Sequence, residues 1–162
     1  VDCVRVGLSH LGLKPDWVLS GINAGANLGV DLYMSGTAGA AREAAILGVP
    51  AFAFSHYHRA DSMIDWLAAT NACSMLFEQY HSRELFDGQF WNVNLPDSEF
   101  LAKAEVETVE VAPDPSPLTL EYLENEGALQ YKSHYHDRPR VKQSDVHCCL
   151  EGAITVSRVS LF

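Results

Sequence analysis

The stretch from Pro15 to Thr37 constrains the fold more than any other part of this chain. Apolar residues at 17–19 are typical of a short buried strand, and the segment that follows is rich in Gly and Asn, which is typical of a loop. An Ala-rich helical segment then begins at Ser35-Gly36-Thr37. A strand, a loop and a helix N-terminus in this order place unpaired backbone N–H groups where an anion can bind.

The order of the other elements predicts an α/β fold. Gly48 and Pro50 end the Ala-rich helix, and the apolar run 51–54 indicates a parallel strand that is buried on both faces. In chain order we expect a helix over 2–12, a strand over 16–20, a helix over 36–47, strands over 51–54 and 90–95, and a final strand over 154–157.

A further helix is expected between the strands at 51–54 and 90–95. Ser62 and Asp65 have the spacing of a capping box, so we expect the helix to begin there. Its buried stripe is predicted at helical spacing. The stripe consists of Trp66, Ala69, Cys73, Leu76, Phe77 and Tyr80.

The residue pattern of the chain changes after about residue 98. Residues 105–111 largely alternate between polar and apolar, which predicts a strand with one solvent-exposed face, and three prolines then interrupt regular structure. Residues 130–140 are rich in Tyr, His and Arg and are expected to form an extended arm or hairpin. We therefore divide the chain near residue 98, into an α/β region over 1–98 and C-terminal strands with an arm over 99–162.

Composition excludes several classes of protein. The formal net charge is −10, which disfavours binding to polymeric nucleic acid, although a small anionic ester is compatible with it. No apolar run approaches the roughly 20 residues of a membrane helix, so no membrane association is expected. The four cysteines have no zinc-site spacing, and free thiols fit a reducing compartment, which favours the cytoplasm.

Several motifs together resemble the SurE family of survival proteins, which act as 5′/3′-nucleotidases. The resemblance runs in order over nearly the whole chain, and its first block is the most specific. The matching motifs are Ser20-Gly21-Ile22-Asn23-x-Gly25-x-Asn27-Leu28-Gly29, Ser35-Gly36-Thr37, Ala40-Ala41-Arg42-Glu43, Leu47-Gly48-Val49-Pro50-Ala51, Trp91-Asn92-Val93-Asn94-Leu95-Pro96-Asp97, Ser144-Asp145-Val146 and Gly152-Ala153-Ile154-Thr155-Val156. It implies a Rossmann-like three-layer α/β fold with a parallel sheet, here incomplete, and a C-terminal β arm that builds a homodimer or tetramer.

The chain departs from the family pattern at its start. SurE proteins begin with a strand that ends in two adjacent aspartates, followed by a metal-binding serine, and nothing in residues 1–14 matches either feature. We expect residues encoded upstream of Val1 to supply the aspartates, and we expect the chain as given to be inactive.

The resemblance also implies roles for the loop residues. Asn23 aligns with a metal-ligand asparagine of the family, and its neutral oxygen suits Mg²⁺, Mn²⁺ or Ca²⁺ when carboxylates supply the charge. Ser35, Gly36 and Thr37 are expected to bind phosphate, with Asn27 as a further member of the same loop. Each residue also has a structural interpretation. An Asn in such a loop often bonds to its own backbone, and Ser35 and Thr37 are common helix caps.

The remaining polar residues carry weaker hypotheses. The pairs His56/His58 and His134/His136 have strand spacing for a bridging zinc ion but lack a third ligand, so we interpret the second pair as arm surface. Asp31 is expected to be a solvated loop residue.

The function predicted is metal-dependent hydrolysis of nucleoside 5′- or 3′-monophosphates. Two alternatives stay open at this stage. One is a catalytically dead oligomerising or ligand-binding module, and the other is a different α/β hydrolase or transferase that uses the same loop.

Overall fold

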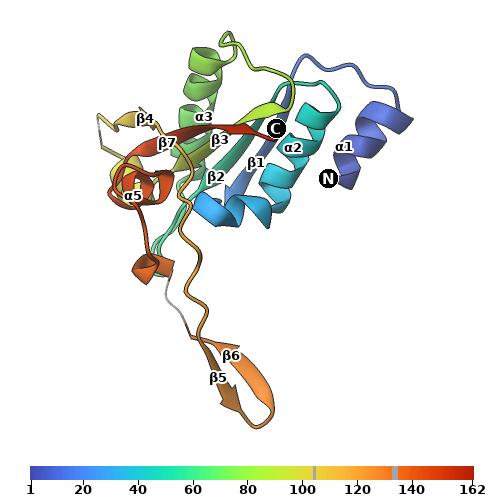
Figure 1. Cartoon of the computed structure of the whole chain (residues 1–162). Coiled ribbons are helices and arrows are strands. Elements are labelled where there is room, and N and C mark those ends of the chain that lie inside the picture. Colours follow the sequence, from blue (N-terminus) through green and yellow to red (C-terminus); the bar gives the residue numbers. More distant parts are fainter. Residues whose placement is uncertain (104, 133–134) are drawn as a thin grey trace.

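A five-stranded sheet organises the computed structural model, which describes residues 1–103, 105–132 and 135–162. Its order is β1-β2-β3-β7-β4, and β1, β2 and β3 are parallel, whereas β7 runs antiparallel to β3 (Figure 1). The strands are β1 (Val18–Ala24), β2 (Ala51–His56), β3 (Gln89–Leu95), β4 (Thr108–Glu110) and β7 (Ile154–Ser160). The expected α/β class is confirmed.

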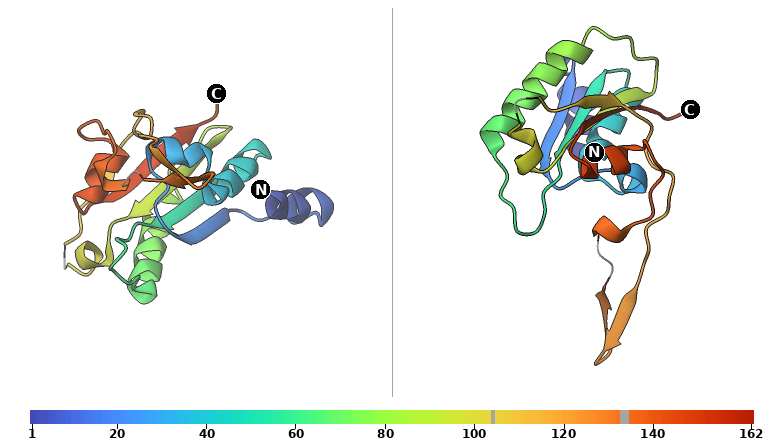
Figure 2. Two further views of the ribbon diagram at one scale, coloured as in Figure 1. Left: turned by 90° about the horizontal axis from the view of Figure 1, so that it is seen from below. Right: turned by 90° about the vertical axis from the view of Figure 1, so that its left-hand side faces the viewer.

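Two helices cover the sheet and make three layers (Figure 2). Every residue of β2 is buried, as the apolar run predicted, because alternate side chains serve two cores. Phe52 and Phe54 pack against α3 (Trp66–Tyr80), whereas Ala51 and Ala53 pack against α2 (Gly36–Ile46). The small alanines of α2 allow that helix to lie close to the sheet.

The N-terminal helix lies outside α2, away from the sheet (Figure 1). It consists of α1 (Asp2–Arg5) and the π-helical turn η1 (Val6–His10). Arg5 binds Glu43 of α2 through two hydrogen bonds, Nε to Oε1 at 2.6 Å and Nη2 to Oε2 at 3.0 Å. This forked pair holds α1 against α2, and it gives a structural role to the glutamate of the Ala-Ala-Arg-Glu motif.

The C-terminal part joins the main sheet and also sends out a hairpin. Both β7 and β4 belong to the same sheet as β1, β2 and β3, so the sheet continues past residue 98. The hairpin of β5 (Tyr122–Asn125) and β6 (Ala128–Tyr131), which we call the arm, projects away from the rest of the molecule (Figure 1). The division of roles between 1–98 and 99–162 stays a prediction.

Three local predictions are corrected. The capping box is wrong, because Asp65 alone caps α3 by accepting hydrogen bonds from the N–H groups of Leu67 and Ala68, while Ser62 donates to Asp97. The strand expected over 105–111 is reduced to the three residues of β4. The arm lies earlier than expected, and the residues after it form the short 3₁₀ helix η3 (Tyr135–Asp137).

The short helical segments η2 (Gly29–Tyr33), α4 (Ser98–Leu101) and α5 (Asp145–Leu150) complete the fold. All four cysteines are free thiols. Within the described ranges, no helix has both the length and the apolar character needed to cross a bilayer.

Candidate functional site

The predicted site residues gather at the carboxyl edge of the sheet. In a parallel β-α-β unit the helix returns against the strands, so its N-terminus lies at the strands' carboxyl ends. Figure 1 shows η2 and the start of α2 at the end of the sheet where β1 and β2 finish. Crevices at this edge are the usual ligand sites of open α/β sheets.

Asn23 lies within β1, not in the loop that the sequence predicted. The register of β1 against β2 shifts between Ser20 and Asn23, so the strand continues to Ala24 with Asn23 opposite Ser55. The Asn23 amide Nδ2 donates to the carbonyl of Gly25 at 2.8 Å. This local bond matches the structural interpretation, and it also orients the amide so that Oδ1 remains available for a ligand.

Asn27 is a buried structural residue. Its Nδ2 donates to Ser55 Oγ at 2.6 Å, and its backbone N–H donates to Asn94 Oδ1 at 2.8 Å. Its carbonyl accepts from Asn92 and Asn94, so the loop after β1 is fixed to β3. The side-chain NH₂ group of Asn27 is therefore already hydrogen-bonded inside the protein. The expected role of Asn27 in phosphate binding stays a prediction.

Ser35 caps α2. Its Oγ accepts a hydrogen bond from the N–H of Ala38 at 3.0 Å, and its carbonyl accepts from the N–H of Gly39. The N–H groups of Gly36 and Thr37 come too early in the helix to have an intrahelical acceptor. A side chain at Gly36 would meet no atom within 4 Å, so this helix start is open to a ligand.

A cavity of about 570 Å³ lies beside Gly25, whose carbonyl accepts the hydrogen bond from Asn23. Its walls come from the segments that follow β1 and β2 and from η3 at the base of the arm. The lining residues are Gly25, Ala26, Tyr57, His58, Arg59, Ala60, Asp61, Tyr135 and His136. Sequence reasoning missed Tyr57, because a Tyr after a buried strand carries no catalytic pattern.

The residues at the base of the arm, 135–138, which we call the arm root, are tied to the loop after β1. Asp31 accepts hydrogen bonds from Tyr135 Oη at 2.9 Å and from Arg138 Nη1 at 2.6 Å. The prediction that Asp31 is solvated is therefore wrong, because its partner Arg138 is almost completely buried. Tyr135 and His136 contact Tyr57 in the same chain, and His136 is also exposed, so its interpretation as arm surface stays a prediction.

Buried carboxylates that sequence reasoning did not single out hold the loops in place. Asp97, directly after β3, accepts from the backbone of Arg59 and from Ser62 Oγ. Burial opposes its ionisation, but these hydrogen bonds outweigh burial and lower the pKa of Asp97. Asp145 accepts from the N–H groups of Gly29 and Asp114, and burial raises its pKa.

None of the described histidines belongs to a group that could hold a metal ion. His56 is fully buried, its Nδ1 contacts the carbonyl of Tyr57 at 2.7 Å, and burial lowers its pKa. His58 Nδ1 contacts the carbonyl of Arg59 instead, and His134 lies outside the described residues. Across residues 1–103, 105–132 and 135–162, no group of three or more His, Cys, Asp and Glu is placed to hold a metal ion. A single neutral oxygen such as Asn23 Oδ1 does not by itself make a metal site.

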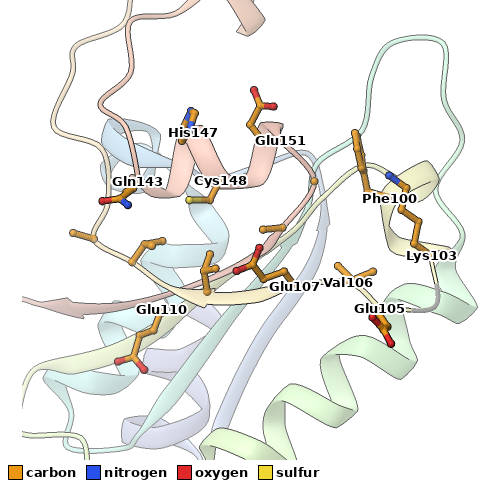
Figure 3. A pocket seen from close by; sticks show the side chains of 15 residues that line it. Phe100, Lys103, Glu105, Val106, Glu107, Glu110, Gln143, His147, Cys148 and Glu151 are labelled. Carbon is orange, nitrogen blue, oxygen red and sulfur yellow. The ribbon is translucent and has the colours of Figure 1, made fainter.

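A larger cavity, of about 900 Å³, lies between β4, α4 and α5 (Figure 3). His147 lies on α5, Glu151 follows directly after α5, and Glu107 comes from the segment before β4 (Figure 3). None of the predicted site residues lines it.

The fold and the position of the site define a Rossmann-like α/β protein with a loop and helix start at the carboxyl edge of its sheet. A family model described as survival protein SurE matches residues 1–114. A Synechocystis protein is 37% identical over 158 residues, which are 98% of this chain and 70% of that protein. The 5′-nucleotidase SurE of Brevibacillus brevis is 33% identical over 176 residues, covering 99% of this chain and 62% of the relative.

A solved structure supports the same family. The crystal structure of the SurE protein from Aquifex aeolicus matches with a TM-score of 0.75 at 27% identity, covering 99% of this chain and 66% of that one. This chain belongs to the SurE family. It spans about two thirds of the length of the Brevibacillus and Aquifex proteins.

Proposed function

We propose that the protein is a phosphomonoesterase that hydrolyses nucleoside 5′- or 3′-monophosphates. Membership of a family whose relatives are named 5′-nucleotidases supports this reaction class. The observation that carries the proposal is the open start of α2, where the N–H groups of Gly36 and Thr37 are free for phosphate oxygens. The helix dipole adds partial positive charge there, which offsets the acidic net charge locally.

Asn23 is proposed as one ligand of a divalent cation, Mg²⁺, Mn²⁺ or Ca²⁺. The fit is incomplete, because the described residues supply no carboxylate cluster beside it. We therefore propose that the charged ligands come from residues outside 1–162, and we expect hydrolysis only when those residues are present.

The test compares the chain as given with a version extended through the residues encoded upstream of Val1. Both are assayed with p-nitrophenyl phosphate and nucleoside monophosphates, with and without Mn²⁺. We expect turnover only in the extended protein with metal, and we expect Asn23→Ala to reduce it at least about 100-fold, the loss typical of a key electrostatic group. Turnover by the shorter chain would contradict the need for further ligands, and metal-independent turnover would favour a different hydrolase.

Asn23→Ala needs a control for folding. Among the described residues the side chain makes one hydrogen bond, which is local, so its removal should cost less than about 1 kcal/mol of stability. An unchanged urea midpoint together with lost activity separates a ligand role from a structural one.

A second candidate function is an oligomerising or ligand-binding module without catalysis. The exposed apolar residues of the arm favour it, because large exposed apolar side chains mark contact surfaces. We propose that the arm builds a homodimer or tetramer in either case. Cytoplasmic location is likewise a proposal, supported by the four free thiols.

A further inference from the structure

The sheet has a free edge at β4. In the strand order β1-β2-β3-β7-β4, β4 comes last, and among the described strands it pairs only with β7. The carbonyl of Glu107 accepts a hydrogen bond from β7 at 2.8 Å, and the N–H of Val111 donates one to β7 at 3.0 Å. Because successive backbone groups of a strand point to opposite sides, the N–H and C=O groups of Thr108 and Glu110 face the free edge. Such an edge is a template for a strand from another chain.

The cavity of about 900 Å³ lies against β4, and we call it the β4 groove. One wall comes from residues 105–112, which include β4, and another from α5 (Figure 3). Among its described lining residues none belongs to β7, so the groove lies on the outer side of the sheet. Val109 and Val111 give it apolar surface. The side chains of a strand added beside β4 would alternate between the two faces of the sheet, and those on the α5 face would enter the groove.

Two exposed carboxylates line opposite walls of the groove. Glu107 lies on the β4 wall and Glu151 on the α5 wall (Figure 3). Neither forms an ion pair with another described residue, whereas Glu110 is already paired with two arginines. The ammonium group of Lys103 also lines the groove, but it lies over the ring of Phe100, 4.2 Å from the centroid. The groove therefore combines apolar surface with negative charge that is available to a partner.

These charges distinguish between the possible occupants of the groove. A second copy of the chain would bring the glutamates of two β4 edges together, and like charges in facing strands are destabilising. The net charge of −10 also makes two copies repel each other. A basic strand meets neither obstacle, because its cationic side chains are attracted to Glu107 and Glu151. Charges that protect an edge strand against its own copies thus favour a partner of opposite sign.

We propose that the β4 groove binds an extended segment of a partner protein that carries lysine or arginine at alternate positions. The segment adds a strand to the free edge, with main-chain hydrogen bonds to Thr108 and Glu110. Its charged groups contact Glu107 and Glu151, and the methylene stems of the same side chains pack on Val109. The proposal is independent of the proposed function, because none of the predicted site residues lines the groove.

A synthetic peptide tests this binding directly. The probe is a fluorescently labelled hexapeptide of alternating lysine and valine with blocked ends, and anisotropy measures its affinity for the protein. We expect the double variant Glu107→Gln/Glu151→Gln to weaken binding about tenfold, as is reasonable for the loss of two exposed ion pairs. Glu78→Gln/Glu84→Gln removes the same charge from exposed sites outside the groove and should bind within about twofold of the wild type. Thermal melts check that both double variants are folded.

Two further peptides separate strand addition from simple attraction between charges. The same hexapeptide methylated on every backbone nitrogen keeps its charge but cannot donate main-chain hydrogen bonds, so its binding should fall at least about tenfold. A hexapeptide with glutamate in place of lysine should not bind. No binding of the first peptide, equal binding of the methylated one, or equal losses in the two double variants would overturn the proposal. Self-association that changes in Glu107→Gln/Glu151→Gln but not in its control, measured by sedimentation, would assign the groove to a second copy and also overturn it.

Discussion

Asp97 shows how a single buried carboxylate fixes the segment that lines the cavity. It accepts hydrogen bonds from the Arg59 backbone at 2.9 Å, from Ser62 Oγ at 2.6 Å and from the Glu99 backbone at 3.2 Å. Asp97→Asn removes the charge from this cluster, and hydrogen bonds to charged groups are worth about 1.5–3 kcal/mol. We expect a loss of about 2 kcal/mol in the free energy of unfolding at pH 7, measured by urea titration.

The lowered pKa of Asp97 also predicts how its contribution to stability changes with pH. The pKa of Asp97 is lowered in the folded state, so its stabilisation is present above the unfolded value of about 3.9 and is lost as the pH falls through the folded value. The difference in the free energy of unfolding between wild type and Asp97→Asn should therefore become smaller below about pH 4. A gap that stays constant from pH 7 to pH 3 would contradict the role assigned to the charge. Asp16→Asn, at an exposed aspartate, serves as the control.

At the scale of single residues, the sequence predicted the positions of the motifs better than the role of each residue. Asn23 and Ser35–Thr37 both lie at the carboxyl edge of the sheet, although Asn23 belongs to β1 and not to the predicted loop. Asn27 and Asp31 share that loop, but their bonds to Ser55 and Arg138 cross about 28 and 107 positions of sequence. Such long-range partners leave no local pattern, so their structural roles could not be predicted.

At the scale of the element, the start of α2 combines a cap with the proposed phosphate site. Ser35→Ala should cost about 1 kcal/mol, the usual value for a lost N-cap. Ser35→Asp keeps a capping oxygen and suits the helix dipole, so stability should be retained. Its negative charge would repel a phosphate, and we expect kcat/KM of the extended protein to fall about tenfold or more.

Asp65→Ala is the matched control at the start of α3. It removes the cap that accepts from Leu67 and Ala68 and should cost about 1 kcal/mol with no change in activity. If Ser35→Asp were stable and fully active, the helix start would not be the phosphate site.

The elements with strong local patterns were predicted well. β2, β3, α2 and β7 lie within a few residues of their expected bounds, because buried runs and Gly or Pro stops are local signals. The errors fall where a tertiary contact determines the local structure. Ser62 is used by Asp97 instead of α3, and the bulge in β1 carries that strand through Asn23.

At the scale of the whole molecule, the arm root lies between the arm and the cavity and is held by the ion pair of Arg138 and Asp31. The Arg138 side chain is 2% exposed, and its Nε and Nη2 have no hydrogen-bond partner among the described residues. Asp31→Asn would remove the charge that balances this arginine, and breaking a buried pair typically costs about 3–5 kcal/mol.

Replacing both partners should cost less than removing one. In Asp31→Asn combined with Arg138→Met, no unpaired buried cation remains, so part of the stability should return. Urea titration of the single and double variants measures the difference. A double variant less stable than Asp31→Asn would show that the arginine stabilises the arm root by packing instead. Glu99→Gln, at the exposed Arg59 pair, should cost less than about 1 kcal/mol.

The arm is proposed to act in contacts outside the monomer. All residues of β5 and β6 are exposed, and an isolated two-stranded hairpin is marginally stable in water. Tyr122 and Tyr131 pair across the strands with centroids 5.7 Å apart, and Leu129, 71% exposed, extends the same face. Cross-strand neighbours two positions apart share a face, so these side chains form one apolar strip.

Leu129→Glu places a charge on this strip without touching the core. The melting temperature of the monomer should change little, because Leu129 is exposed, whereas self-association should weaken about tenfold when a charge enters an apolar contact. Sedimentation equilibrium over a concentration series measures both species. Gln130→Glu adds the same charge to the opposite face of the hairpin and should leave association nearly unchanged. If both variants associate as the wild type does, the exposed strip serves something other than a second copy of the chain, and the oligomer must form through another surface.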